Sequence, residues 1–308
     1  TTSTLYYPIK LLIKHTPIVE TMSEALSSQE LKEIENNLVR LAKDEIGPVL
    51  KSKSGTQFGQ FDDKANQVDL VTVIDKKVES IINKRLTSLY PDFEFIGEET
   101  FKPGLTSITN SPTFIVDPID GTTNFIHGYP YSCVSMGLAV GGEPVVGVVY
   151  NPHLNMMFHA SKGNGSFFND ELIHVTKRSL TLQQSVIALE SGAERSPGSN
   201  FDIKMETYKN LLSDKGGYIH GSRSAGSAAM NMCYVANGML DAYWEGGCWA
   251  WDVCAGWCIL KESGGIVVGG NKDEWDIPVD RRCYLAVRGG CEKSEQQYFV
   301  KSFWSHVA

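Results

Sequence analysis

The sequence predicts a mixed α+β and α/β fold, and three patterns carry this prediction. Apolar residues recur at helical spacing after the capping-box signature Ser27-x-x-Glu30. Two short apolar runs, 93–97 and 113–116, lead directly into acidic residues, as strands do at the functional edge of an α/β sheet. Between residues 133 and 160, apolar stretches alternate with Gly-Gly and Asn-Pro turns, which is typical of antiparallel hairpins.

The composition indicates a globular protein and excludes several classes. The 308 residues suffice for one large domain or two closely joined lobes. Acids outnumber Lys and Arg by 36 to 28 and no long basic run occurs, which argues against nucleic-acid or anionic-membrane partners. A net charge of −8 is at odds with an anionic substrate unless metal ions reverse the charge where it binds, and this tension favours a metal site.

Cysteine and histidine usage exclude further metal and redox sites. The seven cysteines form no C-x-x-C pair, and the seven histidines form no H-x-H or H-E-x-x-H pair. We therefore expect no disulfide framework and no zinc site, and we expect reduced cysteines in a cytoplasmic protein. No apolar run approaches the length that crosses a membrane.

The N-terminal segment is interpreted as an extension outside the fold. Residues 1–21 carry two lysines, a histidine and a single acid, and Met22 resembles a natural start. We expect residues 1–26 to be disordered or non-native, with a weak targeting segment as the alternative. The domain is then expected to span 27–308, with a soft lobe boundary near 180.

Two helices are predicted in the first hundred residues. The first runs from the capping box to Ile46, before Gly47-Pro48. The stretch 51–66 lacks either period and is predicted to be a loop or hairpin that carries Lys64 near the site. Asp75 occupies the position of an N-cap for a second helix, which ends at Tyr90-Pro91.

Further elements are predicted from alternation, helical period and turn residues. Strands are expected at 133–140, 144–150, 156–160, 185–189, 218–223, 240–244, 266–268 and 284–287, and helices at 201–212, 225–236 and 251–262.

The stretch 114–124, FIVDPIDGTTN, ends an apolar run with two acids, a proline and a glycine. Asp117 and Asp120, with the Ile119 carbonyl, are expected to face one point, and the backbone amides from Gly121 onward the next. Oxygen ligands suit a hard divalent cation, and exposed amides suit a phosphate. On its own the stretch also fits a polar turn with its aspartates as turn and cap residues.

Acids occupy similar places elsewhere in the chain. Glu98 and Glu99 follow the strand at 93–97, and Asp252 lies in the first turn of a helix, where the helix dipole alone accounts for it. If these acids converge within about 4 Å, each like-charge pair costs about 4 kcal/mol at an effective dielectric near 20. Bound cations remove that cost, and carboxylates without thiols or imidazoles favour Mg²⁺ over zinc.

A Mg²⁺ cluster beside backbone amides suits hydrolysis of a phosphate ester by an activated water. A dehalogenase-type aspartyl nucleophile requires D-x-D, whereas Asp117 and Asp120 are separated by two residues. A P-loop site is excluded because no G-x-x-x-x-G-K-[ST] occurs.

Three segments together resemble the signatures of the inositol monophosphatase family, in order and at similar spacing. They are Gly97-Glu98-Glu99, Asp117 to Phe125 and Trp251 to Gly256. The similarity extends over about residues 28–304. The resemblance implies a layered α-β-α-β-α sandwich of the sugar-phosphatase type, a homodimer, two or three Mg²⁺ ions and inhibition by lithium.

The resemblance also assigns roles to individual residues. It implies that the metal ligands are Glu98, Asp117, the Ile119 carbonyl, Asp120 and Asp252, with Lys64 near the metals. It implies that Thr122 and Glu98 orient the attacking water, that Asp75 orients Thr122, and that the amides of Gly121 and Thr122 bind the phosphate. It also implies inositol contacts from Gly226, Ala228 and Glu245, with Asp120 and Asp252 beside the substrate.

Two departures from the family pattern affect substrate preference. Trp249 lies in a segment where animal members tend to carry histidine, and Glu190-Ser191-Gly192 matches the substrate-side loop only loosely. The leading hypothesis is hydrolysis of myo-inositol monophosphate, and Glu245 favours such a polyol because a carboxylate accepts hydroxyl hydrogen bonds. The alternatives are a nucleotide 3′-phosphate or sugar phosphate as substrate, or a catalytically silent binding protein.

Overall fold

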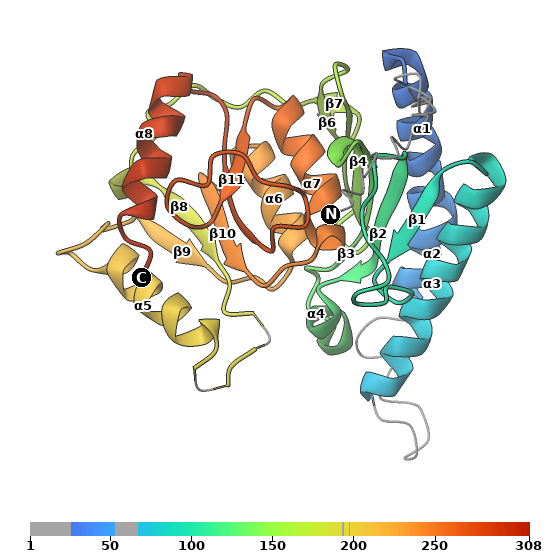
Figure 1. Cartoon of the computed structure of the whole chain (residues 1–308), viewed down its shortest axis with the longest axis horizontal. Coiled ribbons are helices and arrows are strands. Elements are labelled where there is room, and N and C mark those ends of the chain that lie inside the picture. The colour runs from blue at the N-terminus through green and yellow to red at the C-terminus, as the bar shows by residue number, and fades with distance from the viewer. Residues whose placement is uncertain (1–25, 53–66, 193, 197) are drawn as a thin grey trace, which may run out of the picture.

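The computed structural model describes residues 26–52, 67–192, 194–196 and 198–308. These residues form five layers in the order α-β-α-β-α, as the resemblance implies (Figure 1). Lys64 and the expected loop around it, together with the N-terminal extension, lie outside the described residues. No helix in the described part of the chain is both long and apolar enough to cross a membrane.

The first sheet has seven strands in sequential order. They are β1 (Glu94–Gly97), β2 (Thr113–Asp120), β3 (Cys133–Val140), β4 (Glu143–Asn151), β5 (Met156–Ser161), β6 (Ser166–Phe168) and β7 (Glu171–Leu172). Only β1 and β2 pair in parallel, and every later neighbour is antiparallel. The predicted hairpins are confirmed, and two short strands continue the series past the turn at 163–165.

The outer helical layer continues further than the sequence predicts. The capping box at Ser27 is present, and α1 (Ser28–Arg40) follows it. The chain then passes through the wider π-turns of η1 (Leu41–Ile46) into α2 (Gly47–Lys51), so the expected stop at Gly47-Pro48 is wrong. Pro48 lies in the first turn of α2, a position that proline favours.

The predicted N-cap at Asp75 is also wrong. Helix α3 (Gln67–Leu89) begins eight residues earlier, which places Asp75 in its interior. The β-branched run before Asp75 has weak helix propensity, but helix propensity is readily overridden by tertiary context. As a result the Asp75 carboxyl lies in the packed interface between α3 and the sheet, with 4% of its surface exposed.

The second sheet has the strand order β11-β12-β10-β8-β9. Its strands are β8 (Val186–Leu189), β9 (Gly221–Arg223), β10 (Ala242–Gly246), β11 (Ile266–Gly269) and β12 (Cys283–Val287). The 3₁₀ turn η3 (Leu182–Gln184) precedes it, and α5 (Asn200–Leu212) and α8 (Lys293–Trp304) form its outer layer (Figure 1). Helix α8 was not predicted. The first sheet ends at Leu172 and the second begins at Val186, on either side of residue 180.

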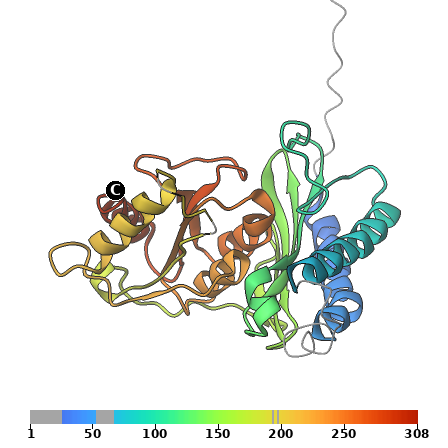
Figure 2. The same cartoon turned by 90° about the horizontal axis from the view of Figure 1, so that it is seen from below.

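Helices α6 (Ala228–Ala236) and α7 (Ala250–Glu262) form the middle layer between the two sheets (Figure 2). Two glycines that pair across β3 and β4, Gly137 and Gly147, let α7 lie very close to the first sheet. A Cβ on Gly147 would lie 2.1 Å from the Ala255 carbonyl oxygen, and one on Gly137 would lie 2.5 Å from Cys254 Sγ. These glycines therefore determine how closely α7 packs against the first sheet.

We predict that Gly147→Ala lowers the free energy of unfolding by about 1–3 kcal/mol, because α7 must move away from the sheet. Denaturant unfolding measures this. The matched control is Gly221→Ala on β9, where the nearest contact of an added Cβ is 3.5 Å away. Equal stability of the two variants would contradict the proposed close packing of α7.

Candidate active site

Strand β2 carries the first two acids of the site and is longer than predicted. It pairs with β3 through Asp117, opposite Ser135, and again at Asp120, opposite Cys133, with a bulge between them. The expected strand end at Val116 is therefore wrong, because the bulge takes up Pro118, which cannot donate to the ladder. Asp117 and Asp120 are 2% and 7% exposed.

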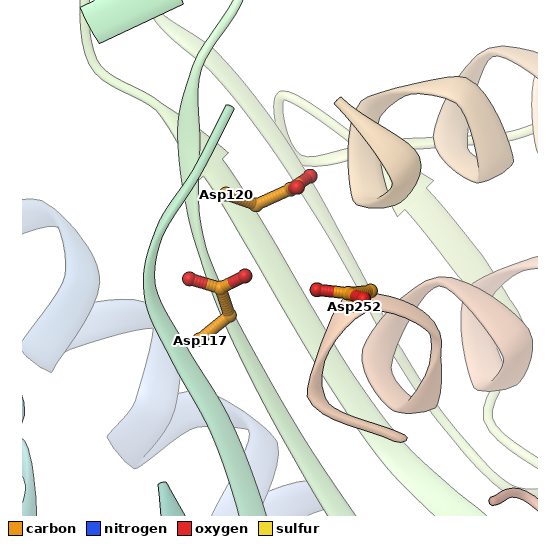
Figure 3. A group of neighbouring side chains, drawn as sticks. All are labelled: Asp117, Asp120 and Asp252. Atoms are coloured by element: carbon orange, nitrogen blue, oxygen red, sulfur yellow. The ribbon is translucent and has the colours of Figure 1, made fainter. Parts of the chain in front are cut away.

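Asp252 completes a group of three carboxylates. It lies in the first turn of α7, as predicted, and α7 brings it over the end of β2 (Figure 3). One carboxylate oxygen from each of Asp117, Asp120 and Asp252 lies within 4.8 Å of the other two. Segments more than 130 residues apart in the sequence thus meet at one point.

Hydrogen bonds fix the orientation of each carboxylate. Asp117 Oδ1 accepts from the Ile119 N–H at 2.9 Å, and Asp252 Oδ2 accepts from the Trp249 N–H at 2.6 Å. Asp120 Oδ2 accepts from the Ser227 hydroxyl at 2.5 Å and the Ala229 N–H at 2.8 Å. These bonds engage one oxygen of each acid.

Burial and mutual repulsion raise the pKa values of five acids in this region. Loss of hydration is the largest cause, and it raises the pKa of Asp75 to about 8, of Glu98 to about 7 and of Asp120 to about 6. The pKa values of Asp117 and Asp252 are also raised, by burial first and then by neighbouring carboxylates. Glu98 keeps an exposed side, so solvent partly screens its repulsion.

The donor set fits divalent cations. Across the described residues, no Lys, Arg or His forms an ion pair with any of these five acids. Asp75 Oδ1 is buried without a hydrogen-bond partner. Carboxylates packed together without a protein cation are the oxygen-rich environment that hard metal ions occupy.

The turn after β2 presents backbone amides beside the acids. Gly121 has φ +84°, and a Cβ there would lie 2.9 Å from the Tyr131 carbonyl oxygen, so only glycine fits. Helix α4 (Thr122–His127) follows it directly and was not predicted.

The expected pairing of Asp75 with Thr122 differs from the structure. The Thr122 hydroxyl donates to the Ile119 carbonyl at 3.0 Å. The reason is local, because a threonine in the first helical turn reaches the carbonyl three residues earlier.

A cleft of about 1090 Å³ opens beside the carboxylates. Five of the residues predicted for the site line it, namely Asp120, Gly226, Ala228, Glu245 and Asp252. The remaining described site residues lie outside this lining. Asp75 lies on α3, Glu98 follows β1, Asp117 and Ile119 lie on β2, Gly121 follows β2, and Thr122 begins α4.

Glu190 has a role that the sequence did not reveal. Its carboxylate accepts from the Ala225 N–H at 2.7 Å, the Gly226 N–H at 2.9 Å and the Asn231 side chain at 2.9 Å. It thereby holds the loop that leads into α6 and forms one wall of the cleft. The partners lie 35 or more residues away in the chain, and a loosely matched sequence motif carried no signal of these contacts.

Carboxylates without cationic partners, next to backbone amides and an open cleft, define a metal-assisted phosphate-ester hydrolase. The family model described as the inositol monophosphatase family matches residues 30–308. The chain belongs to this family, and it is a phosphoric monoester hydrolase.

Individual relatives agree with this membership. Inositol monophosphatase 2 of Saccharomyces cerevisiae is 69% identical over 92% of this chain and 98% of its own. Inositol monophosphatase 1 of the same yeast is 53% identical over 90% and 97%. Among solved structures, the inositol monophosphatase from Anabaena is 29% identical and covers 90% of this chain and 97% of its own, with a TM-score of 0.73.

We predict that the chelated protein loses stability as the pH rises from 5 to 8. The Asp75 carboxyl has a pKa of about 8 in the folded chain, whereas in an unfolded chain it titrates near 3.8. Between these values the folded state holds a proton that the unfolded state lacks, so the free energy of unfolding falls as pH rises.

The Asp75→Asn variant has no titratable carboxyl at this position. Its free energy of unfolding should therefore fall less steeply as the pH rises from 5 to 8. Melting temperatures measured in excess chelator at several pH values test this. Parallel curves for the two proteins would show that Asp75 does not hold a raised pKa.

Proposed function

We propose that this chain hydrolyses myo-inositol monophosphate to inositol and inorganic phosphate, with Mg²⁺ as its metal. The cluster of three carboxylates formed by Asp117, Asp120 and Asp252 is the observation that carries the proposal. With Glu98 and the Ile119 carbonyl, these acids would hold two or three ions. Bound Mg²⁺ supplies the chemistry by lowering the pKa of water and by neutralising phosphate oxygens.

Residues of the turn after β2 would bind and align the reactants. The amides of Gly121 and Thr122 would donate to phosphate oxygens, since they open α4 and have no helical acceptor there. Glu98 and the Thr122 hydroxyl would orient the attacking water, with Glu98 as acceptor of its proton.

Glu245 supports a polyol as the leaving group. Its Oε2 accepts from the buried Tyr243 hydroxyl at 2.6 Å, which fixes the carboxylate and leaves Oε1 for a substrate hydroxyl. Gly226 and Ala228 face the same cleft without bulky side chains. The names of the two yeast relatives, inositol monophosphatase 2 and 1, favour the same substrate.

A second candidate is a phosphatase of the same family that acts on a nucleotide 3′-phosphate or a sugar phosphate. The size of the cleft, about 1090 Å³, favours it because that volume admits a leaving group larger than inositol. A homodimer and lithium inhibition follow from the family resemblance, a cytoplasmic location follows from the cysteine usage, and all three stay predictions.

We predict Mg²⁺-dependent release of phosphate that is fastest with inositol 1-phosphate among inositol 1-phosphate, adenosine 3′,5′-bisphosphate and a hexose phosphate. Asp120→Asn should reduce kcat by at least about 100-fold, because it removes a metal ligand. Circular dichroism checks that the variant stays folded.

Each outcome has its own meaning. Faster turnover of the bisphosphate would move the assignment to the second candidate. An Asp120→Asn protein with ordinary activity would refute the proposed metal site.

A further inference from the structure

Four side chains form a brace across the rim of the site, and neither the metal nor the substrate roles use them. The brace consists of Phe101, Trp249, Trp251 and Arg282. Phe101 lies three residues after Glu98, the two tryptophans flank the start of α7, and Arg282 directly precedes β12. The brace therefore joins three separate segments of the chain.

The rings of the brace are in mutual contact. Trp249 and Trp251 stack with centroids 5.1 Å apart and planes 13° apart. Phe101 lies 5.2 Å from the Trp249 ring and meets Trp251 edge-on at 5.1 Å. Ring pairs at these separations attract beyond simple burial, so Phe101 links the turn after β1 to the start of α7.

Arg282 closes the brace from the second sheet. Its guanidinium carbon lies 3.5 Å from the centre of the Trp249 ring, within the range of a cation–π contact. It also donates to the carbonyls of Gly247 at 2.7 Å and Cys248 at 3.3 Å. Its backbone has φ +66°, an unfavourable conformation for arginine that the surrounding contacts must maintain.

Each end of the brace is bonded to a segment that carries a site acid. The Phe101 N–H donates to the Gly97 carbonyl at 2.9 Å and closes a turn around Glu98. The Trp249 N–H donates to Asp252 Oδ2 at 2.6 Å. A shift of either ring therefore moves the backbone that aims Glu98 or Asp252.

The brace lies at the margin of the hydrophobic core, against which Phe101 and Trp249 pack. Trp249 and Arg282 both line the cleft, and Phe101 is only partly buried. The fit of α7 to the first sheet depends on Gly137 and Gly147 of β3 and β4, which face the helix at Cys254 and Ala255 and not at the brace.

We propose that Phe101 and Trp249 are positioning residues that hold Glu98 and Asp252 at the mutual distance required to bind metal. This inference rests on the proposed function only in naming Mg²⁺, since it concerns metal affinity and no particular substrate.

Calorimetric titration of the purified protein with Mg²⁺ alone tests the proposal. We expect Phe101→Ala and Trp249→Ala each to weaken Mg²⁺ binding about tenfold, as loss of residues that orient ligands does elsewhere. The double variant should bind Mg²⁺ only slightly more weakly than the more affected single variant, because both changes disrupt the same connected group of contacts. Trp249→Phe keeps a ring at the centre of the brace and should retain most of the affinity.

Phe168→Ala is the matched control. Phe168 is also a partly buried ring, stacked on Phe158 with centroids 4.6 Å apart, but it lies on β6, which pairs with neither β1 nor β2. It should lower the melting temperature and leave the Mg²⁺ affinity unchanged. If Phe101→Ala does not fold, Phe101→Leu serves in its place, with a smaller loss of affinity expected.

The proposal is overturned if the brace variants lose thermal stability as Phe168→Ala does but bind Mg²⁺ like the unmodified protein. It is equally overturned if the effects of Phe101→Ala and Trp249→Ala simply add. Failure of the protein to hydrolyse inositol 1-phosphate would refute the assigned substrate and leave this result standing, since Mg²⁺ binding is measured without substrate.

Discussion

Repulsion among buried carboxylates governs the architecture of this protein. Asp117, Asp120 and Asp252 present oxygens within 4.8 Å of one another, and no cationic side chain in the described part of the chain pairs with them. Such a group is costly in a domain of ordinary stability, and it persists because the surrounding structure holds it and because cations can neutralise it. Phosphate chemistry depends on the same group, since cations held there would attract an anionic ester to an acidic protein.

The fold contributes to this cluster at several levels. The bulge in β2 lets Asp117 and Asp120 both stay buried at one strand end. Paired glycines in the first sheet allow α7 to lie low enough for Asp252 to reach them. Backbone and hydroxyl donors then aim individual oxygens, so that burial, hydrogen bonding and repulsion act on the same few atoms.

The elements that local sequence patterns encode could be predicted from the sequence. The hairpins of the first sheet follow from alternation and glycine turns, and Asp252 follows from its place at a helix start. Predictions were wrong or missing where contacts between residues distant in the sequence decide the structure. Asp75 resembled a cap because a β-branched run precedes it, yet that run is helical and Asp75 lies inside α3. Glu190 acts through partners 35 to 41 residues away, which no local pattern encodes.

The central claim is that the carboxylates hold protons until a cation replaces them, and proton release on metal binding tests it most directly. Mg²⁺ titrated calorimetrically at pH 6.5, in buffers of different ionisation enthalpy, counts the protons released. The raised pKa values of Asp75, Glu98 and the aspartate group predict release of about one proton or more per chain. Binding of Mg²⁺ with no release of protons would contradict the claim.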